Sequence, residues 1–325
     1  MKLLSTALLL LVSIAAAEQS TKPATPVREG TDNDVVTLAK PSPGLHLRYT
    51  LDGSTPGAKS GPYLAPVRMP AGYKLRAVTV SDDRKQVSDE IVAEGATSAD
   101  KKLSSSIVPC TQDRDFPIYD WAKRHAAVTA LVNERKPALV FIGDSITQMF
   151  GGEPHDRPQP GKDVWEKYYG KRNAANLGFG YDFTENTLWR LQNGELDGAA
   201  AKLVVLNIGT NNVGKNTPTE IVEGIKAVLA EIRRSQPKAA ILLLGIYPRG
   251  PKPDATREKL TAINRDLAQL DGKDNITFLD VTAKLLQPDG AITREIMGDF
   301  LHPTARGYEI IADAIEPTVK RLLGE

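Results

Sequence analysis

Residues 138–145 read Ala-Leu-Val-Phe-Ile-Gly-Asp-Ser, an apolar run that ends in a polar turn carrying a serine. A short run of large apolar residues closed by glycine predicts a buried strand. Open α/β folds bind their ligands beside the carboxyl ends of their strands. We therefore place Ser145 at the reactive edge of a sheet, as a candidate nucleophile that needs a base and an oxyanion site from elsewhere in the chain.

Strands and helices are expected to alternate on both sides of this stretch. Continuous apolar runs such as 203–206 fit strands buried on both faces, which indicates a parallel sheet covered by helices. The expected fold is a three-layer α/β/α sandwich with a doubly wound parallel sheet. Its expected strands are 138–142, 173–177, 203–208, 240–246 and 276–280, and its helices lie near 119–135, 184–193, 217–235, 255–270 and 304–323.

Residues 1–17 have the pattern of a secretory signal peptide, with Lys2, a short apolar stretch and three alanines ending at Ala17. We therefore expect a secreted or periplasmic protein without stable membrane insertion after cleavage. Loss of the leader leaves 40 basic and 40 acidic residues, so the net charge does not favour nucleic acid as a partner. Cys110 is the only cysteine, which excludes an internal disulfide and a thiolate metal site. The oligomeric state is not indicated.

Residues 24–95 have a different composition, with short alternating runs separated by Pro, Gly and Asp-Gly turns, and they predict a small all-β domain. The run 49–56, Tyr-Thr-Leu-Asp-Gly-Ser-Thr-Pro, resembles the chitobiase/β-hexosaminidase C-terminal-like module, an Ig-like sandwich appended to many secreted carbohydrate enzymes. The resemblance implies an accessory role. A linker is expected at 96–107 and a catalytic domain at 108–325. A chain that begins near Ser106 is expected to keep its activity on small esters.

His302 is the candidate base among the four histidines. It follows Asp299 by three residues, between the last expected strand and the last expected helix, at the sheet edge where Ser145 lies. A carboxylate at this spacing can orient one ring nitrogen while the other faces the serine. The alternative is that Asp299 only caps a helix. Structural or solvent roles are favoured for the other three histidines, His46, His125 and His155.

Asn211 is the candidate side-chain donor for an oxyanion, because Gly209-Thr210-Asn211 follows the expected strand 203–208. Asparagine-rich turns are common, so the motif gains weight only beside the serine and histidine. The backbone N–H of Ser145 and one on the loop after residue 176 complete the expected donors. For Asp144, a role in holding the serine turn is favoured over a role as catalytic acid.

Together these residues resemble the SGNH/GDSL hydrolase superfamily. Within it the chain is similar to the catalytic subunits of platelet-activating-factor acetylhydrolase and their bacterial relatives, through 188–196 and the Asp-Phe-Leu-His run at 299–302. The resemblance covers about 115–322 and implies a flavodoxin-like fold, with Ser145 as nucleophile, His302 as base, Asp299 as orienting acid and Asn211 as oxyanion donor. The four family blocks are Gly143-Asp144-Ser145, Asn176-Leu177-Gly178-Phe179-Gly180, Gly209-Thr210-Asn211 and Asp299-Phe300-Leu301-His302.

One position departs from the family pattern. The second backbone donor usually belongs to a glycine before an aspartate, whereas Tyr181 stands there, between Gly180 and Asp182. Its N–H survives the change, but a Cβ narrows the allowed φ and a ring can intrude on the acyl pocket. Gly178 and Gly180 are expected to keep this loop compact.

The resulting hypothesis is an exported serine esterase that removes short acyl groups, acetyl above all, from carbohydrates or glycoconjugates through an acyl-enzyme. This chemistry needs no cofactor and no metal, and its partner is a small-molecule or polysaccharide acyl ester. The expected preference for acetyl groups comes from the family resemblance. The expected preference for carbohydrates comes from the β domain and from export. The alternatives are a lipid-directed acetylhydrolase or lysophospholipase, and a glycan-binding protein with little catalytic power.

Overall fold

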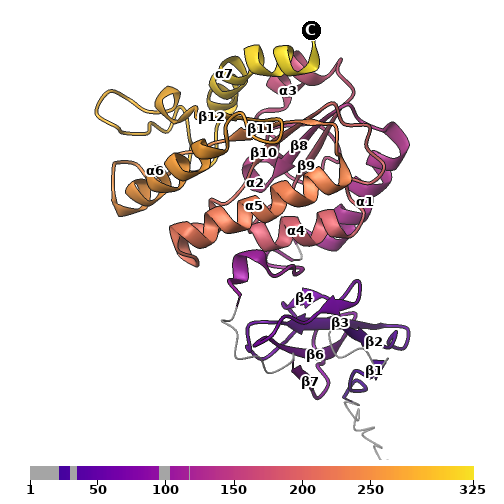
Figure 1. Cartoon of the computed structure of the whole chain (residues 1–325). Coiled ribbons are helices and arrows are strands. Elements are labelled where there is room, and N and C mark those ends of the chain that lie inside the picture. Colours follow the sequence, from indigo (N-terminus) through magenta and orange to yellow (C-terminus); the bar gives the residue numbers. More distant parts are fainter. Residues whose placement is uncertain (1–21, 30–34, 95–102, 117) are drawn as a thin grey trace, which may run out of the picture.

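The protein is described by a computed structural model over residues 22–29, 35–94, 103–116 and 118–325. The expected signal peptide and most of the expected linker lie outside the described residues. Figure 1 shows a small β domain in indigo and a larger α/β domain whose central sheet lies between helices. Among the described residues, no helix combines the length and apolar character needed to cross a membrane.

A five-stranded parallel sheet forms the centre of the larger domain, in the order β9-β8-β10-β11-β12. The chain changes its direction of winding between β8 and β10, and such switch points are where open α/β sheets bind ligands. Ser145 comes two residues after the end of β8, so the topology places it there. The strands are β8 (Leu139–Gly143), β9 (Ala174–Gly178), β10 (Leu203–Asn207), β11 (Ala240–Leu244) and β12 (Ile276–Leu279).

Helices cover both faces of this sheet because its strands are apolar on both faces (Figure 1). In β8, Val140 and Ile142 join the core under α1, α4, α5 and α6, whereas Leu139 and Phe141 join the core under α3 and α7. The helices are α1 (Trp121–Arg135), α2 (Ser145–Gln148), α3 (Lys162–Tyr169), α4 (Thr184–Gln192), α5 (Pro218–Ser235), α6 (Ala255–Leu267) and α7 (Ala305–Leu323).

The small domain packs two antiparallel sheets, β1-β2-β5 and β4-β3-β6-β7, around a core of its own. Val108, which lies beyond the expected linker, belongs to that core. The chain therefore contacts the β domain again after leaving it. The strands are β1 (Arg28–Glu29), β2 (Val35–Leu38), β3 (Leu45–Thr50), β4 (Gly61–Pro62), β5 (Val67–Arg68), β6 (Lys74–Ser81) and β7 (Ile91–Glu94).

The α/β/α fold and the small β domain expected from the sequence are confirmed. The bounds of the five parallel strands differ from the expected ones by no more than two residues. Helices α2 and α3 were not expected from the sequence, because helices of one or two turns are too short to display a hydrophobic period. The 3₁₀ turn Ser105–Ile107 was also not expected, and in it Ser106 donates a hydrogen bond to the carbonyl of Glu220 on α5 (2.7 Å).

Candidate active site

Ser145, His302 and Asp299 lie in a hydrogen-bonded row. Ser145 is the first residue of α2, and its Oγ lies 2.9 Å from Nε2 of His302. Nδ1 of the same ring lies 2.7 Å from Oδ2 of Asp299. A carboxylate on Nδ1 favours the tautomer in which Nε2 is free to accept the serine proton. The geometry brings together the three residues that the sequence analysis proposed as nucleophile, base and orienting acid.

The loop before α7 keeps the Asp299 carboxylate ionised. Burial opposes ionisation, but hydrogen bonds from the backbone N–H and ring of His302, the charge of that ring and the backbone N–H of Leu301 together lower the pKa of Asp299. Oδ1 accepts from the backbone N–H groups of His302 (2.7 Å) and Leu301 (3.0 Å). Oδ2 is left for the imidazole, so one side chain fixes both the loop and the ring.

The turn that carries Ser145 is built by its two predecessors. Oδ1 of Asp144 accepts from the backbone N–H of Ile146 (2.9 Å), which caps the start of α2. The Asp144 carboxyl is buried, and burial raises its pKa to about 7. At Gly143 a Cβ would lie 2.1 Å from Oγ1 of Thr147 and 2.3 Å from the carbonyl of Asn207, so only glycine fits. These contacts place Asp144 in the turn that carries Ser145.

Three hydrogen-bond donors that the sequence analysis proposed for the oxyanion remain available. Within the described chain, the backbone N–H groups of Ser145 and Tyr181 donate to no other atom. The side-chain amide of Asn211 donates one N–H to the carbonyl of Asp182 (2.9 Å), which fixes the amide plane and leaves its second N–H without an acceptor. Unpaired donors of this kind are what a developing oxyanion requires.

The loop that carries Tyr181, residues 178–182, lies directly against α2, and we call it the oxyanion loop. A Cβ at Gly178 would lie 2.1 Å from the backbone nitrogen of Gln148, so the two segments meet backbone to backbone. The N–H of Gly180 donates to Oε1 of Gln148 (2.7 Å). The predicted role of both glycines in compactness agrees with these contacts, which tie the loop to the turn of Ser145.

Two protein-family models match this chain. A family model described as the GDSL-like Lipase/Acylhydrolase family matches residues 141–310. The chain belongs to this family. A model of the Chitobiase/beta-hexosaminidase C-terminal domain matches residues 27–92. Both family resemblances seen in the sequence are thereby confirmed, and this GDSL-like acylhydrolase is a carboxylic ester hydrolase.

Individual relatives agree with the family assignment. Platelet-activating factor acetylhydrolase IB subunit alpha2 of Rattus norvegicus is 34% identical over 206 residues, which are 63% of this chain and 86% of the relative. Subunit alpha1 of Homo sapiens is 35% identical over 206 residues, 63% of this chain and 85% of the relative. A solved GDSL-like lipase of Bacteroides thetaiotaomicron superposes with a TM-score of 0.50 at 19% identity, over 61% of this chain and 97% of that chain. That structure supports the fold.

Tyr181, which stands where the family usually has glycine, adopts the left-handed backbone conformation that glycine favours. Its φ is 64°, a region that glycine occupies without strain, and its side chain is 41% exposed. The guanidinium of Arg157 lies 5.5 Å from the centre of its ring. The backbone N–H is therefore retained while the ring is directed to the surface.

The acylhydrolase with Tyr181→Gly is expected to keep kcat on a small acetyl ester within about threefold, because the N–H stays in place. The free energy of unfolding should change by less than about 1 kcal/mol, since relief of the left-handed strain is offset by the greater freedom of glycine in the unfolded chain. Steady-state kinetics and urea unfolding measure both. A tenfold loss of kcat would show that the ring takes part in turnover.

A buried charge network behind the oxyanion loop was missed by the sequence analysis. Asp182 is fully buried and accepts from Nε1 of Trp121 (2.7 Å) and Nε of Arg190 (2.8 Å). Arg190 also pairs with Glu195, which in turn contacts Nδ1 of His125 (3.0 Å). Asp182 lies two residues before α4 and Arg190 lies within it, and this eight-residue separation was the signal in the sequence. The network explains His125 as a structural residue.

The remaining predicted positions lie where a supporting or solvent role fits. Gly209 follows β10 with φ 116°, and a Cβ there would lie 2.9 Å from Ile246, so the turn before Asn211 requires glycine. His46 pairs with Asp82 at the surface of the β domain, and His155 contacts Gln159 on an exposed loop. In the described part of the chain, no group of three or more His, Cys, Asp or Glu is placed to hold a metal ion.

Proposed function

We propose that this acylhydrolase is an exported serine esterase that removes acetyl groups from carbohydrates or glycoconjugates. The observation that carries the proposal is the hydrogen-bonded row from Ser145 through His302 to Asp299. Three hydrogen-bond donors accompany it, and each keeps one N–H group that has no acceptor in the described chain. A nucleophile, a base, an orienting acid and an oxyanion site are the four parts that acyl transfer needs.

The proposed reaction has two halves. In the first, Oγ of Ser145 attacks the ester carbonyl while Nε2 of His302 takes its proton, and the resulting oxyanion is held by the N–H groups of Ser145, Tyr181 and Asn211. Collapse of this intermediate breaks the bond to the alcohol, which receives the proton from His302. In the second half, His302 takes a proton from water, the hydroxide attacks the acyl-enzyme, and acetate leaves as Ser145 recovers its proton.

The substrate class rests on the β domain and on the expected leader. Residues 27–92 match a module named after the C-terminal domain of carbohydrate-degrading enzymes, which supports a glycan substrate. The relatives named as platelet-activating factor acetylhydrolase subunits support an acetyl group and favour a second candidate, a lipid-directed acetylhydrolase. We rank a glycan substrate above a lipid substrate because the β domain, which supports the glycan, packs against the catalytic domain through buried contacts. A glycan-binding protein with little catalytic power is the third candidate.

Acetate release decides among these candidates. We expect kcat/KM on acetylated oligosaccharides to exceed that on a 2-acetyl glycerophospholipid by about tenfold or more. Both should be measured by coupled acetate detection, with Ser145→Ala as the blank. A reversed preference would establish the lipid candidate, and no Ser145-dependent acetate from any ester would establish the binding protein. Export is tested separately, because the secreted protein should begin at Glu18.

A further inference from the structure

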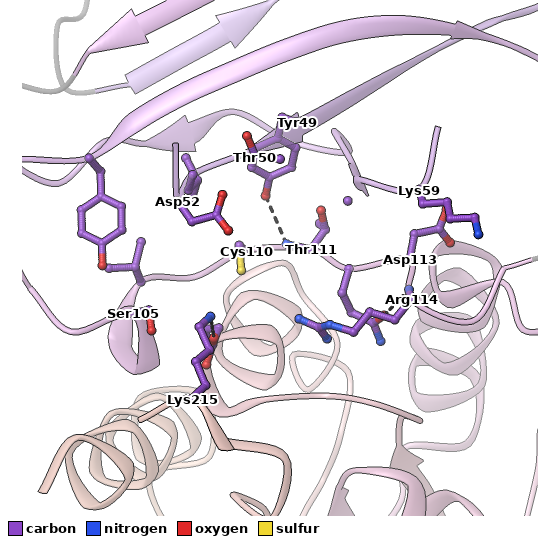
Figure 2. A pocket seen from close by; sticks show the side chains of 16 residues that line it. Tyr49, Thr50, Asp52, Lys59, Ser105, Cys110, Thr111, Asp113, Arg114 and Lys215 are labelled. Carbon is purple, nitrogen blue, oxygen red and sulfur yellow. Dashed lines mark hydrogen bonds and ion pairs between the residues drawn. The ribbon is translucent and has the colours of Figure 1, made fainter. Parts of the chain in front are cut away.

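Residues 110–114 run between the two domains, and we call them the bridging segment. Their side chains alternate in direction, as in an extended strand. Thr111 and Asp113 contact the β domain, whereas Gln112 and Arg114 contact the oxyanion loop. Figure 2 shows Tyr49, Thr111, Asp113 and Arg114 around a pocket of about 180 Å³ where the domains meet.

The β domain holds this segment through buried polar contacts. Oδ2 of Asp113 accepts from Arg48 (2.8 Å) and Arg84 (2.7 Å), and the Asp113 side chain is 2% exposed. The hydroxyl of Tyr49 accepts from the backbone N–H of Thr111 (3.1 Å), and Oγ1 of Thr111 donates to the carbonyl of Pro62 (2.7 Å). Hydrogen bonds to buried charged groups are stronger than those between neutral groups, so these contacts fix the position of the bridging segment.

The other two side chains of the bridging segment hold carbonyl groups of the oxyanion loop. Nε2 of Gln112 donates to the carbonyl of Gly180 (2.8 Å), and Arg114 donates to the carbonyl of Tyr181 (2.9 Å). The carbonyl of Gly180 and the N–H of Tyr181 belong to one trans peptide plane and point in opposite directions. Gln112 therefore sets the direction in which the Tyr181 N–H points.

We infer that the β domain is a structural part of the oxyanion hole. Arg48 and Arg84 fix Asp113, Asp113 fixes the bridging segment, and Gln112 with Arg114 aims the Tyr181 N–H at the oxyanion. Gln112 and Arg114 are positioning residues, because neither touches the reacting atoms. The inference rests on the proposed serine chemistry. Contrary to the expectation from the sequence, it predicts that removal of the β domain lowers turnover.

The test uses full-length Gln112→Leu and Asp113→Asn, with Arg76→Gln as the matched control. Arg76 pairs with Glu90 and donates to the carbonyl of Gly53, so its hydrogen bonds in the described chain stay inside the β domain. We expect Gln112→Leu to lower kcat on a small acetyl ester by about 10- to 100-fold, with KM changed by less than about threefold. Asp113→Asn should lower kcat by about three- to tenfold, and Arg76→Gln should leave it unchanged.

Labelling of Ser145 by a fluorophosphonate supplies a second readout of the oxyanion site, because formation of its adduct also passes through a stabilised oxyanion. The labelling rate should fall in parallel with kcat in variants whose circular dichroism is native. Gln112→Asn replaces Gln112→Leu if the latter does not fold. Native kcat in a folded Gln112 variant or in Asp113→Asn would overturn the inference, while an active Ser145→Ala would instead overturn the proposed function.

Discussion

Ser145→Ala and His302→Ala are each expected to lower kcat on a small acetyl ester by about 10⁴- to 10⁶-fold. The 2.9 Å contact from Oγ of Ser145 to Nε2 of His302 makes the two side chains one unit. Without the hydroxyl no acyl-enzyme forms, and without the imidazole the hydroxyl keeps its proton. The double variant should therefore be scarcely slower than either single one, since losses within such a unit are not additive.

Two controls keep this result specific. His46→Ala removes a histidine of the β domain that pairs with an exposed Asp82, and its kcat should equal that of the unchanged protein. Circular dichroism of the Ser145 and His302 variants should be native, because neither side chain belongs to the apolar cores on the two faces of the sheet. Turnover by Ser145→Ala within about tenfold of native would exclude this serine as the nucleophile.

The sequence predicted those parts of the site that local patterns encode. The apolar run at 138–142 followed by Gly143-Asp144-Ser145 placed the nucleophile at a strand end, and the position of His302 before α7 brought the base to the same edge. Parallel sheets collect the carboxyl ends of their strands on one side, so order along the chain was enough. The family model spans residues 141–310, a range that includes both Ser145 and His302.

Other parts of the site could not be predicted, because many of them depend on contacts between segments far apart in the chain. Gln112 and Gly180 are 68 residues apart, and nothing in the pattern of either indicates the other. The bridging segment reads as a polar loop because its alternating faces are both polar, one toward each domain. The buried pairing of Asp182 with Arg190 and Glu195 was missed for a different reason: the three residues are close in the chain, but charged residues usually face solvent.

Asp299→Asn is expected to lower kcat by about 10²- to 10³-fold. The amide oxygen can still accept from the backbone N–H groups of Leu301 and His302, so the loop should survive. Its NH₂ group would then face Nδ1 of His302 in place of Oδ2. That contact favours the tautomer with the proton on Nε2, which cannot accept from Ser145. Because the Asp299 side chain is 59% exposed, water screens its charge, and we expect a smaller loss than for a fully buried carboxylate.

The pH dependence separates this role from a purely structural one. The folded protein lowers the pKa of Asp299, so its contribution to stability is present above the unfolded value of about 3.9 and is lost as the pH falls through the lower folded value. At pH 6 to 8 the Asp299 carboxylate is therefore ionised throughout. The loss caused by Asp299→Asn should accordingly persist across that range in steady-state kinetics. Activity restored to within threefold of native by a change of pH in this window would show that a group other than Asp299 orients the imidazole.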